Sequence, residues 1–242
     1  MRFICYLPLL TLSALLLSCG GRDTPKTEHS KPMVAREAIH IDTTRLAHNT
    51  RCLALAGAYP VIRGIVDETF ARRVNDRLKD VFMGYFNKYK KEGVCDPTEL
   101  AGDTSAMGMS GLEANGSFSV LTADERTLSL TQLFVSNPFM GNAWGFEFDV
   151  VNFDLNNKRA LTTRDLLRGG PSTKQINQTV RQYFDHQFGQ DGAIDYPVIR
   201  ASGLDSLHLA VRHDSLMLVI EAWPTSHASH SIYEIPLAKY PQ

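Results

Sequence analysis

The sequence has no excess of basic residues. Its 242 residues include 25 lysines and arginines against 26 aspartates and glutamates, a formal net charge of −1. Surfaces that bind nucleic acid are usually strongly basic, so this balance argues against nucleic acid as a partner. The sequence also lacks an apolar run near its start as long as the ~20 residues that a membrane-spanning helix needs. The N-terminal run, LPLLTLSALLL, covers only residues 7–17.

Recognised catalytic spacings are missing as well. The sequence contains no His-Glu-x-x-His, no closely spaced cysteine pair and no Gly-x-Ser-x-Gly around Ser110. These absences argue against a recognised zinc site and against a serine acyl-transfer enzyme. We therefore expect no cofactor.

Two weaker candidates for chemistry remain. His227 and His230 lie three residues apart and could hold Zn²⁺ if a third ligand joined them, although an exposed polar bend also accounts for both. Glu147 and Asp149 lie on one face of a predicted strand, as the paired carboxylates of a glycosidase could. Alternation along a strand produces such pairs on any solvated sheet face, so neither pair predicts a catalytic or metal site.

The N-terminus has the pattern of a lipoprotein signal. Arg2 precedes the apolar run, and residues 16–20 read Leu-Leu-Ser-Cys-Gly. A short basic start, an apolar segment and small residues at a cleavage point are typical of an export signal, with an uncleaved anchor as the alternative. We expect a signal over residues 1–18 and a lipid on Cys19 that binds a membrane. The chain would then lie in the cell envelope outside the cytoplasm, with the outer membrane as the expected site.

Two cysteines remain after Cys19. An even number of thiols in an oxidising compartment is typical of a disulfide, so we predict a bond between Cys52 and Cys95; two unpaired buried thiols are the alternative. Closing a loop of this length would contribute about 4 kcal/mol to stability. Residues 19–36 are rich in Gly, Pro, Thr, Ser and charged residues, which predicts a flexible tether.

The next part of the chain predicts two strands followed by a long helix. Alternation at residues 39–42 and apolar runs at 52–56 and 59–62 indicate the strands. From Asp67 to Gly93 apolar residues recur at intervals of three and four, typical of an amphipathic helix. Its many basic residues could form a binding patch, but interleaved acidic residues favour a solvated helix face. Residues 96–117 show no period and predict a mobile loop.

The second half contains what we expect to be the central strands. Leu128 and Leu130 alternate with Ser129 and Thr131, and residues 146–150 alternate in the same way, which predicts two half-buried antiparallel strands. Further elements are expected as follows: helices at 162–167 and from Pro171 to Gly189, and strands at 207–211, 216–220 and 232–235.

A Gly-rich bend between the central strands carries the candidate binding residues. They are Phe139, Met140, Asn142 and Trp144. A turn between strands normally lies at the surface. Large apolar side chains in such a turn suggest that they pack into the core or bind a partner. Trp144 is therefore either a plug of the core or an exposed anchor for a protein or sugar.

Several short motifs, in order, resemble the extracytoplasmic domains of bacterial lysozyme-sensing anti-sigma factors and the accessory domains of peptidoglycan deacetylases. The motifs are Tyr59-Pro60, Val74-Asn75, residues 153–167 (FDLNNKRALTTRDLL), Ile176-Asn177 and residues 233–237 (YEIPL). One difference is the bend at 141–145, which reads Gly-Asn-Ala-Trp-Gly where the family usually has Gly-Gly-Ala-His-Gly. The resemblance spans nearly the whole chain after residue 36.

The resemblance and the residues together predict an α+β protein: antiparallel sheets in two sub-domains, 37–115 and 116–242, with one long amphipathic helix packed on each. The resemblance implies a binding or sensing role, with lysozyme, another envelope protein or cell-wall glycan as the partner. A periplasmic hydrolase that acts on carbohydrate or peptidoglycan is the alternative.

Overall fold

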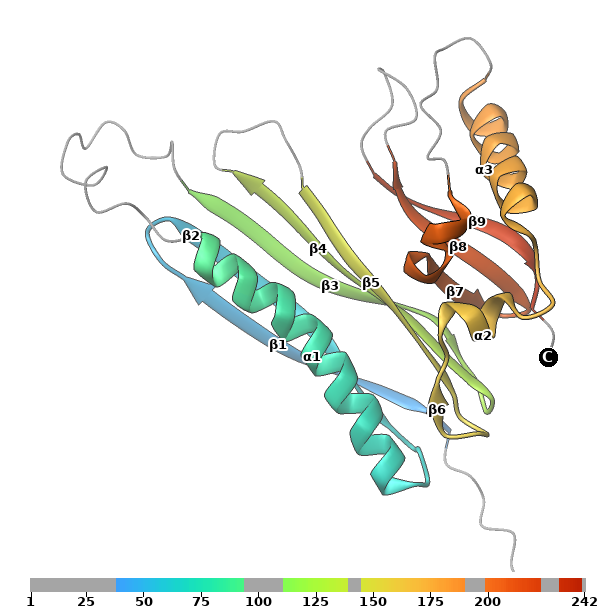
Figure 1. The fold of residues 1–242 in the computed structure, drawn as a ribbon. Coiled ribbons are helices and arrows are strands. Elements are labelled where there is room, and N and C mark those ends of the chain that lie inside the picture. The colour runs from blue at the N-terminus through green and yellow to red at the C-terminus, as the bar shows by residue number, and fades with distance from the viewer. Residues whose placement is uncertain (1–37, 94–110, 139–144, 190–198, 223–230, 241–242) are drawn as a thin grey trace, which may run out of the picture. The chain divides into compact units, whose positions relative to one another are not determined.

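The computed structural model describes residues 38–93, 111–138, 145–189, 199–222 and 231–240 (Figure 1). Its elements are β1 (His40–Asn49), β2 (Leu53–Arg63), α1 (Glu68–Glu92), β3 (Leu112–Ala123), β4 (Thr127–Pro138), β5 (Gly145–Asp154), β6 (Arg159–Ala160), α2 (Thr163–Leu167), α3 (Thr173–Phe188), the 3-10 turn η1 (Ala201–Ser206), β7 (His208–Arg212), β8 (Ser215–Ala222) and β9 (Ser231–Lys239). The predicted α+β class is confirmed.

The larger sheet has six strands in chain order, β1 to β6, and it is mixed rather than antiparallel. β2 and β3 run parallel, with Leu53 opposite Leu112, whereas its other neighbouring strands are antiparallel. The all-antiparallel prediction was therefore wrong for this sheet. Parallel neighbours need a long crossover, and here α1 lies in the connection between β2 and β3. The boundary predicted between residues 115 and 116 falls inside β3.

The long helix α1 begins and ends where the sequence predicted. The Asp67 side chain accepts a hydrogen bond from the Phe70 N–H, and the Gly93 N–H donates to the Tyr89 carbonyl. The buried face of the helix is formed by Phe70, Val74, Leu78, Val81, Phe82, Phe86 and Tyr89. This face packs against the six-stranded sheet (Figure 1).

Two glycines of the sheet make room for aromatic rings under α1. Gly57 and Gly116 are opposite each other in the β2–β3 pairing. A Cβ atom at Gly57 would lie 2.8 Å from the Phe82 ring, and one at Gly116 would lie 2.5 Å from the Phe134 ring. Residues 112–117 were predicted as part of a loop, but they are strand. The inward-facing Gly116 has no side chain because the Phe134 ring occupies that space.

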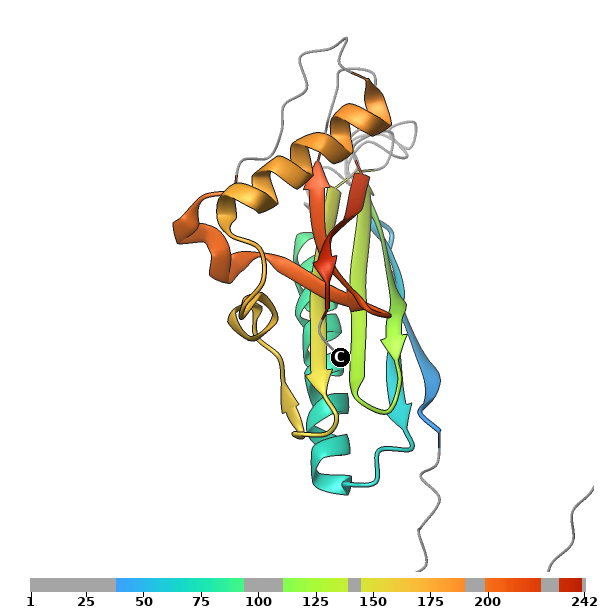
Figure 2. The ribbon, with the colours of Figure 1, turned by 90° about the vertical axis from the view of Figure 1, so that its right-hand side faces the viewer.

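The smaller sheet, β7-β8-β9, is antiparallel and carries α3 on one face (Figure 2). The core between them contains Ile176, Val180, Phe184, Leu209, Val211, Leu216, Leu218 and Ile235. At 16 residues α3 is shorter than α1 at 25, so only one of the two helices is long as predicted. It ends at Gly189 as expected, while its N-cap is Ser172, one residue after Pro171.

The two sheets meet through β7, whose edge away from β8 is bonded by buried polar side chains. Asn152 Nδ2 donates to the Leu209 carbonyl at 2.7 Å, and the Val211 N–H donates to Ser129 Oγ at 3.0 Å. Thr122 Oγ1 donates to the Val211 carbonyl at 2.8 Å. Ser129 is 0% exposed, so the prediction that β4 is only half-buried was wrong, because β7 covers its polar face.

Candidate functional site

Several residues that the sequence singled out lie outside the described residues. They are Cys19, Cys95, Ser110, the bend residues Phe139, Met140, Asn142 and Trp144, and the pair His227 and His230. The lipid, the disulfide and the role of Trp144 therefore stay predictions. Cys52, the other half of the predicted disulfide, is described and is buried just before β2.

The carboxylates Glu147 and Asp149 are held by cations. Lys88 of α1 contacts Glu147, and Arg77 of α1 lies 3.6 Å from Asp149. His208 Nδ1 of β7 is 3.8 Å from the Asp149 carboxylate. This cluster therefore has the character of ion pairs that join α1 and β7 to β5.

The charge states of this cluster follow from the same contacts. The hydrogen bond to Glu147 raises the pKa of Lys88, which keeps the ammonium charged. Burial lowers the pKa of His208, and the Asp149 charge opposes that shift. His208 also packs its ring on Phe148, 4.6 Å between ring centres. We conclude that these groups fasten elements together, which accounts for their position without catalysis.

A cavity of about 520 Å³ lies elsewhere, beside α3. Four parts of the chain line it: the end of α2 with the segment after it, one flank of α3, the start of β8, and the end of β9 with the residue that follows. The lining residues are Leu166, Arg168, Gly169, Gly170, Pro171, Gln175, Gln178, Thr179, Gln182, Leu216, Leu237, Ala238, Lys239 and Tyr240. We call this the α3–β9 pocket. Its volume falls in the range typical of ligand sites, roughly 300–1,000 Å³.

The rim formed by residues 168–171 follows α2, to which the Arg168 N–H donates at the Asp165 carbonyl (3.4 Å) and the Gly170 N–H at the Leu167 carbonyl (2.9 Å). The Asp165 side chain is itself fixed within the turn before the rim. The Thr162 N–H and hydroxyl both hydrogen bond to the Asp165 carboxylate, and Arg159 lies 3.0 Å from it. These bonds lower the pKa of Asp165 to about 2. Gly169 has φ +71°, a conformation that glycine adopts without strain. The rim is therefore defined by local hydrogen bonds and one backbone turn.

The opposite wall is shaped by an irregularity in β9. Leu216 pairs with Ala238 and Met217 pairs with Pro236, so Leu237 is an extra residue on β9. Such a bulge bends a strand and turns side chains toward new directions. The Tyr240 N–H donates to the Asp214 carbonyl, which fixes the chain just past the strand. Burial raises the pKa of the Tyr240 hydroxyl, so this group stays a neutral hydrogen-bonding group.

The lining residues determine what the α3–β9 pocket can do chemically. Three glutamines, Thr179 and Tyr240 offer hydrogen bonds, and Arg168 and Lys239 offer positive charge above an apolar floor. None of the lining residues is Asp, Glu, His or Cys. In the part of the chain that the structure describes, no three such residues gather as a metal site would require. The pocket is equipped to bind a polar ligand.

Sequence reasoning missed this pocket, but one signal pointed to the helix that forms it. The pentapeptide Tyr-Pro-Val-Ile-Arg occurs at 59–63 and again at 196–200. Asn75 of α1 bonds the N–H and C=O of Ile62 at 2.7 and 2.9 Å. Asn177 of α3 bonds the same two groups of Ile199 at 2.9 and 2.8 Å. Each helix is thus tied by an asparagine to one copy of the repeat.

Comparisons with known proteins show the fold and name no activity. No protein-family model matches the chain, and no curated protein does. A solved DUF3298 family structure from Bacteroides fragilis superposes with a TM-score of 0.53 and 12% identity, covering 83% of this chain and 90% of that one. One from Pseudomonas aeruginosa gives 0.51 and 12%, covering 82% and 90%. At such identity the chain shares the fold of these uncharacterised proteins.

None of the described helices has both the length and the apolar character that crossing a bilayer requires.

Proposed function

We propose that the protein is a cell-envelope lipoprotein whose folded part binds cell-wall glycan through the α3–β9 pocket and does not catalyse a reaction. The carrying observation is the lining of the pocket, which combines amides, hydroxyls and cations over an apolar floor. Sugars present hydroxyl and acetamido groups at their edges and apolar C–H faces, and binding sites match such ligands with a few placed polar groups on an apolar surface. The motif resemblance to lysozyme-sensing and deacetylase-associated domains supports a partner in the cell wall.

The amides on the flank of α3 provide the first test. Gln178 and Gln182 both line the pocket and are exposed. Changing both to Ala should weaken binding of soluble peptidoglycan fragments by about tenfold, because each lost hydrogen bond contributes about 0.5–1.5 kcal/mol. The melting temperature should stay unchanged, since exposed side chains contribute little to stability. Isothermal titration calorimetry measures the first quantity, and a thermal melt the second.

The matched control is Gln187→Ala, an exposed glutamine of the same helix that does not line the pocket. It should bind as the unchanged protein does. If the double variant binds fragments with unchanged affinity, the pocket is not the glycan site. If the unchanged protein binds lysozyme but no glycan fragment, a protein partner replaces the glycan in this proposal.

The envelope location rests on Cys19, and the redox state on Cys52 and Cys95. We expect the purified protein to carry acyl mass on Cys19, and its thiols at Cys52 and Cys95 to resist alkylation until a reductant is added, as a disulfide requires. Intact-mass spectrometry after alkylation of the unfolded, unreduced protein reads out both. A Cys19→Ser variant should lose the acyl mass and leave the detergent phase. Acyl mass retained in that variant, or two alkylated thiols, would refute the corresponding prediction.

A further inference from the structure

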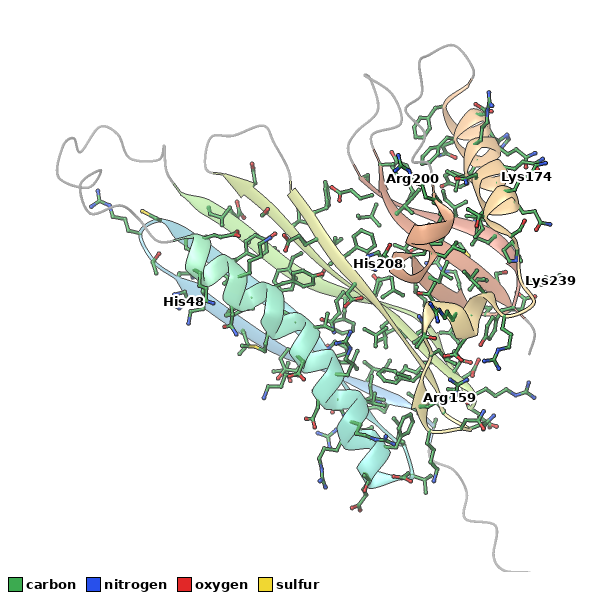
Figure 3. The ribbon with its side chains drawn as sticks, in the orientation of Figure 1. His48, Arg159, Lys174, Arg200, His208 and Lys239 are labelled. Carbon is green, nitrogen blue, oxygen red and sulfur yellow. The ribbon has the colours of Figure 1, made fainter. Side chains whose placement is uncertain are left out.

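We propose that the α3–β9 pocket selects a glycan that carries a carboxylate, such as an amino sugar bearing an acidic ether substituent. This inference rests on the proposed glycan binding and adds the charge of the ligand. Three features bring positive charge to the pocket: Arg168 on the rim, Lys239 at the end of β9, and the N-terminus of α3. Figure 3 labels Lys239.

The guanidinium of Arg168 has N–H donors that can bind a ligand. Its Nη2 lies 3.7 Å from the Asp165 carboxylate, and its side chain is 82% exposed. Asp165 is already occupied by Thr162 and by Arg159 at 3.0 Å. A guanidinium has five N–H donors, so this single long contact leaves most of them available. Their planar arrangement suits the two oxygens of a carboxylate.

Lys239 adds a second cation from the opposite wall. It is exposed at the end of β9, and among the described residues no carboxylate lies in ion-pair distance of it. Asp214 lies near that wall: its backbone carbonyl accepts from the Tyr240 N–H, and its carboxylate accepts from the Ser215 hydroxyl at 3.3 Å. Asp214 is not among the residues that line the pocket. Lys239 therefore has no ion-pair partner among the described residues, Arg168 has only its long contact with Asp165, and no Asp or Glu lines the pocket.

The N-terminus of α3 adds to the positive charge near the pocket. The positive end of a helix dipole favours anions, and helices often place their own acidic residue there. α1 has Glu68 in its first turn and α2 has Asp165, but the first turn of α3 contains no acidic residue. It contains Lys174 instead, an exposed residue of α3 that is labelled in Figure 3. The capping bonds of Ser172 and Gln175 are neutral and leave the dipole uncompensated.

A matched pair of disaccharides tests the charge of the ligand. N-acetylglucosaminyl-N-acetylmuramic acid and N,N′-diacetylchitobiose differ by one lactyl ether and hence by one carboxylate. We expect the unchanged protein to bind the acidic disaccharide about tenfold more tightly in calorimetric titrations, because charge-assisted hydrogen bonds are stronger than neutral ones. The difference should shrink as salt is raised, because exposed charges are screened.

The double variant Arg168→Gln/Lys239→Gln should bind both disaccharides equally, at the affinity of the neutral one. Arg45→Gln, which removes one exposed cation from β1, is the control and should keep the tenfold preference. Free lactate should bind far more weakly than the acidic disaccharide, which separates a glycan site from a general carboxylate site.

The outcomes distinguish the two proposals. If both disaccharides bind the unchanged protein with equal affinity, or if the preference survives in the double variant, the carboxylate inference is overturned while glycan binding stands. If lactate binds as tightly as the disaccharide, the pocket recognises a carboxylate and not a glycan. If neither disaccharide binds, glycan binding itself fails.

Discussion

Replacing Phe134 with Ala should lower the free energy of unfolding by about 3–5 kcal/mol. Phe134 is 0% exposed and lies under α1. Its ring centre is 5.2 Å from that of Phe82 and 5.9 Å from that of Tyr89. Removing the ring loses its burial and leaves a cavity between the helix and β4, because surrounding side chains relax only partly. Urea denaturation followed by circular dichroism measures the change.

A second substitution, at Gly116, tests the packing of the Phe134 ring directly. Gly116→Ala alone should also destabilise the protein, since its Cβ would lie 2.5 Å from the Phe134 ring. In the Phe134→Ala background that steric conflict is gone, so the second change should cost little and the two effects should not add. Val66→Ala is the control, because Val66 is 69% exposed and its loss should change stability by less than about 0.5 kcal/mol. Additive effects of the two changes would contradict the proposed ring-over-glycine packing.

Asn152→Leu should lower the free energy of unfolding by about 2–4 kcal/mol. Asn152 Nδ2 donates to the Leu209 carbonyl at 2.7 Å, and its Oδ1 accepts from the Ser129 hydroxyl at 2.6 Å. A leucine side chain of similar volume keeps the packing but leaves the carbonyl and the hydroxyl without these buried partners. Each unsatisfied buried group costs about 1–3 kcal/mol. Asn115→Ala, an exposed asparagine on β3, should have almost no effect.

Amide hydrogen exchange gives this second prediction a local readout. The Val211 N–H donates to Ser129 Oγ, and the His213 N–H donates to Thr122 Oγ1. Ser129→Ala should therefore speed exchange at Val211 more than at His213, and Thr122→Ala should do the reverse. Equal exchange at both amides in both variants would mean that these side chains do not hold the edge of β7.

Much of the secondary structure was predictable because its signals are local. Asp67 and Gly93 bound α1 as expected, since a capping side chain and a glycine stop act within one helical turn. The antiparallel pairing of β4 and β5 also followed from their alternation and the bend between them. The last strand was less well predicted: β9 extends to Lys239 rather than ending at 235, and the pocket wall lies in that extension.

The candidate site was less predictable than the fold. The sequence directed attention to the bend around Trp144 and to Glu147 and Asp149, because large apolar residues in a turn and paired carboxylates are conspicuous. The α3–β9 pocket instead uses ordinary residues such as Gln178, Arg168 and Lys239, which gain a shared role only when segments distant in the sequence meet. No residue spacing in the sequence indicates that these segments come together in the fold.

The sequence by itself determined the long helix α1, the strands β4 and β5, and which side chains of α1 and α3 face inward, because a period of 3.6 or 2 is a property of neighbouring residues. Only the tertiary structure decided the parallel pairing of β2 with β3, the burial of Ser129 and the small residues at Gly57 and Gly116. A periodic pattern shows which face of a helix or strand is buried, but it does not show which element packs against that face. Here the edge of β7 bonds the Ser129 hydroxyl, on a strand face that the local pattern predicted to be solvated. The rings of Phe82 and Phe134 fill the space beside Gly57 and Gly116, and the local pattern around Gly116 predicted a loop.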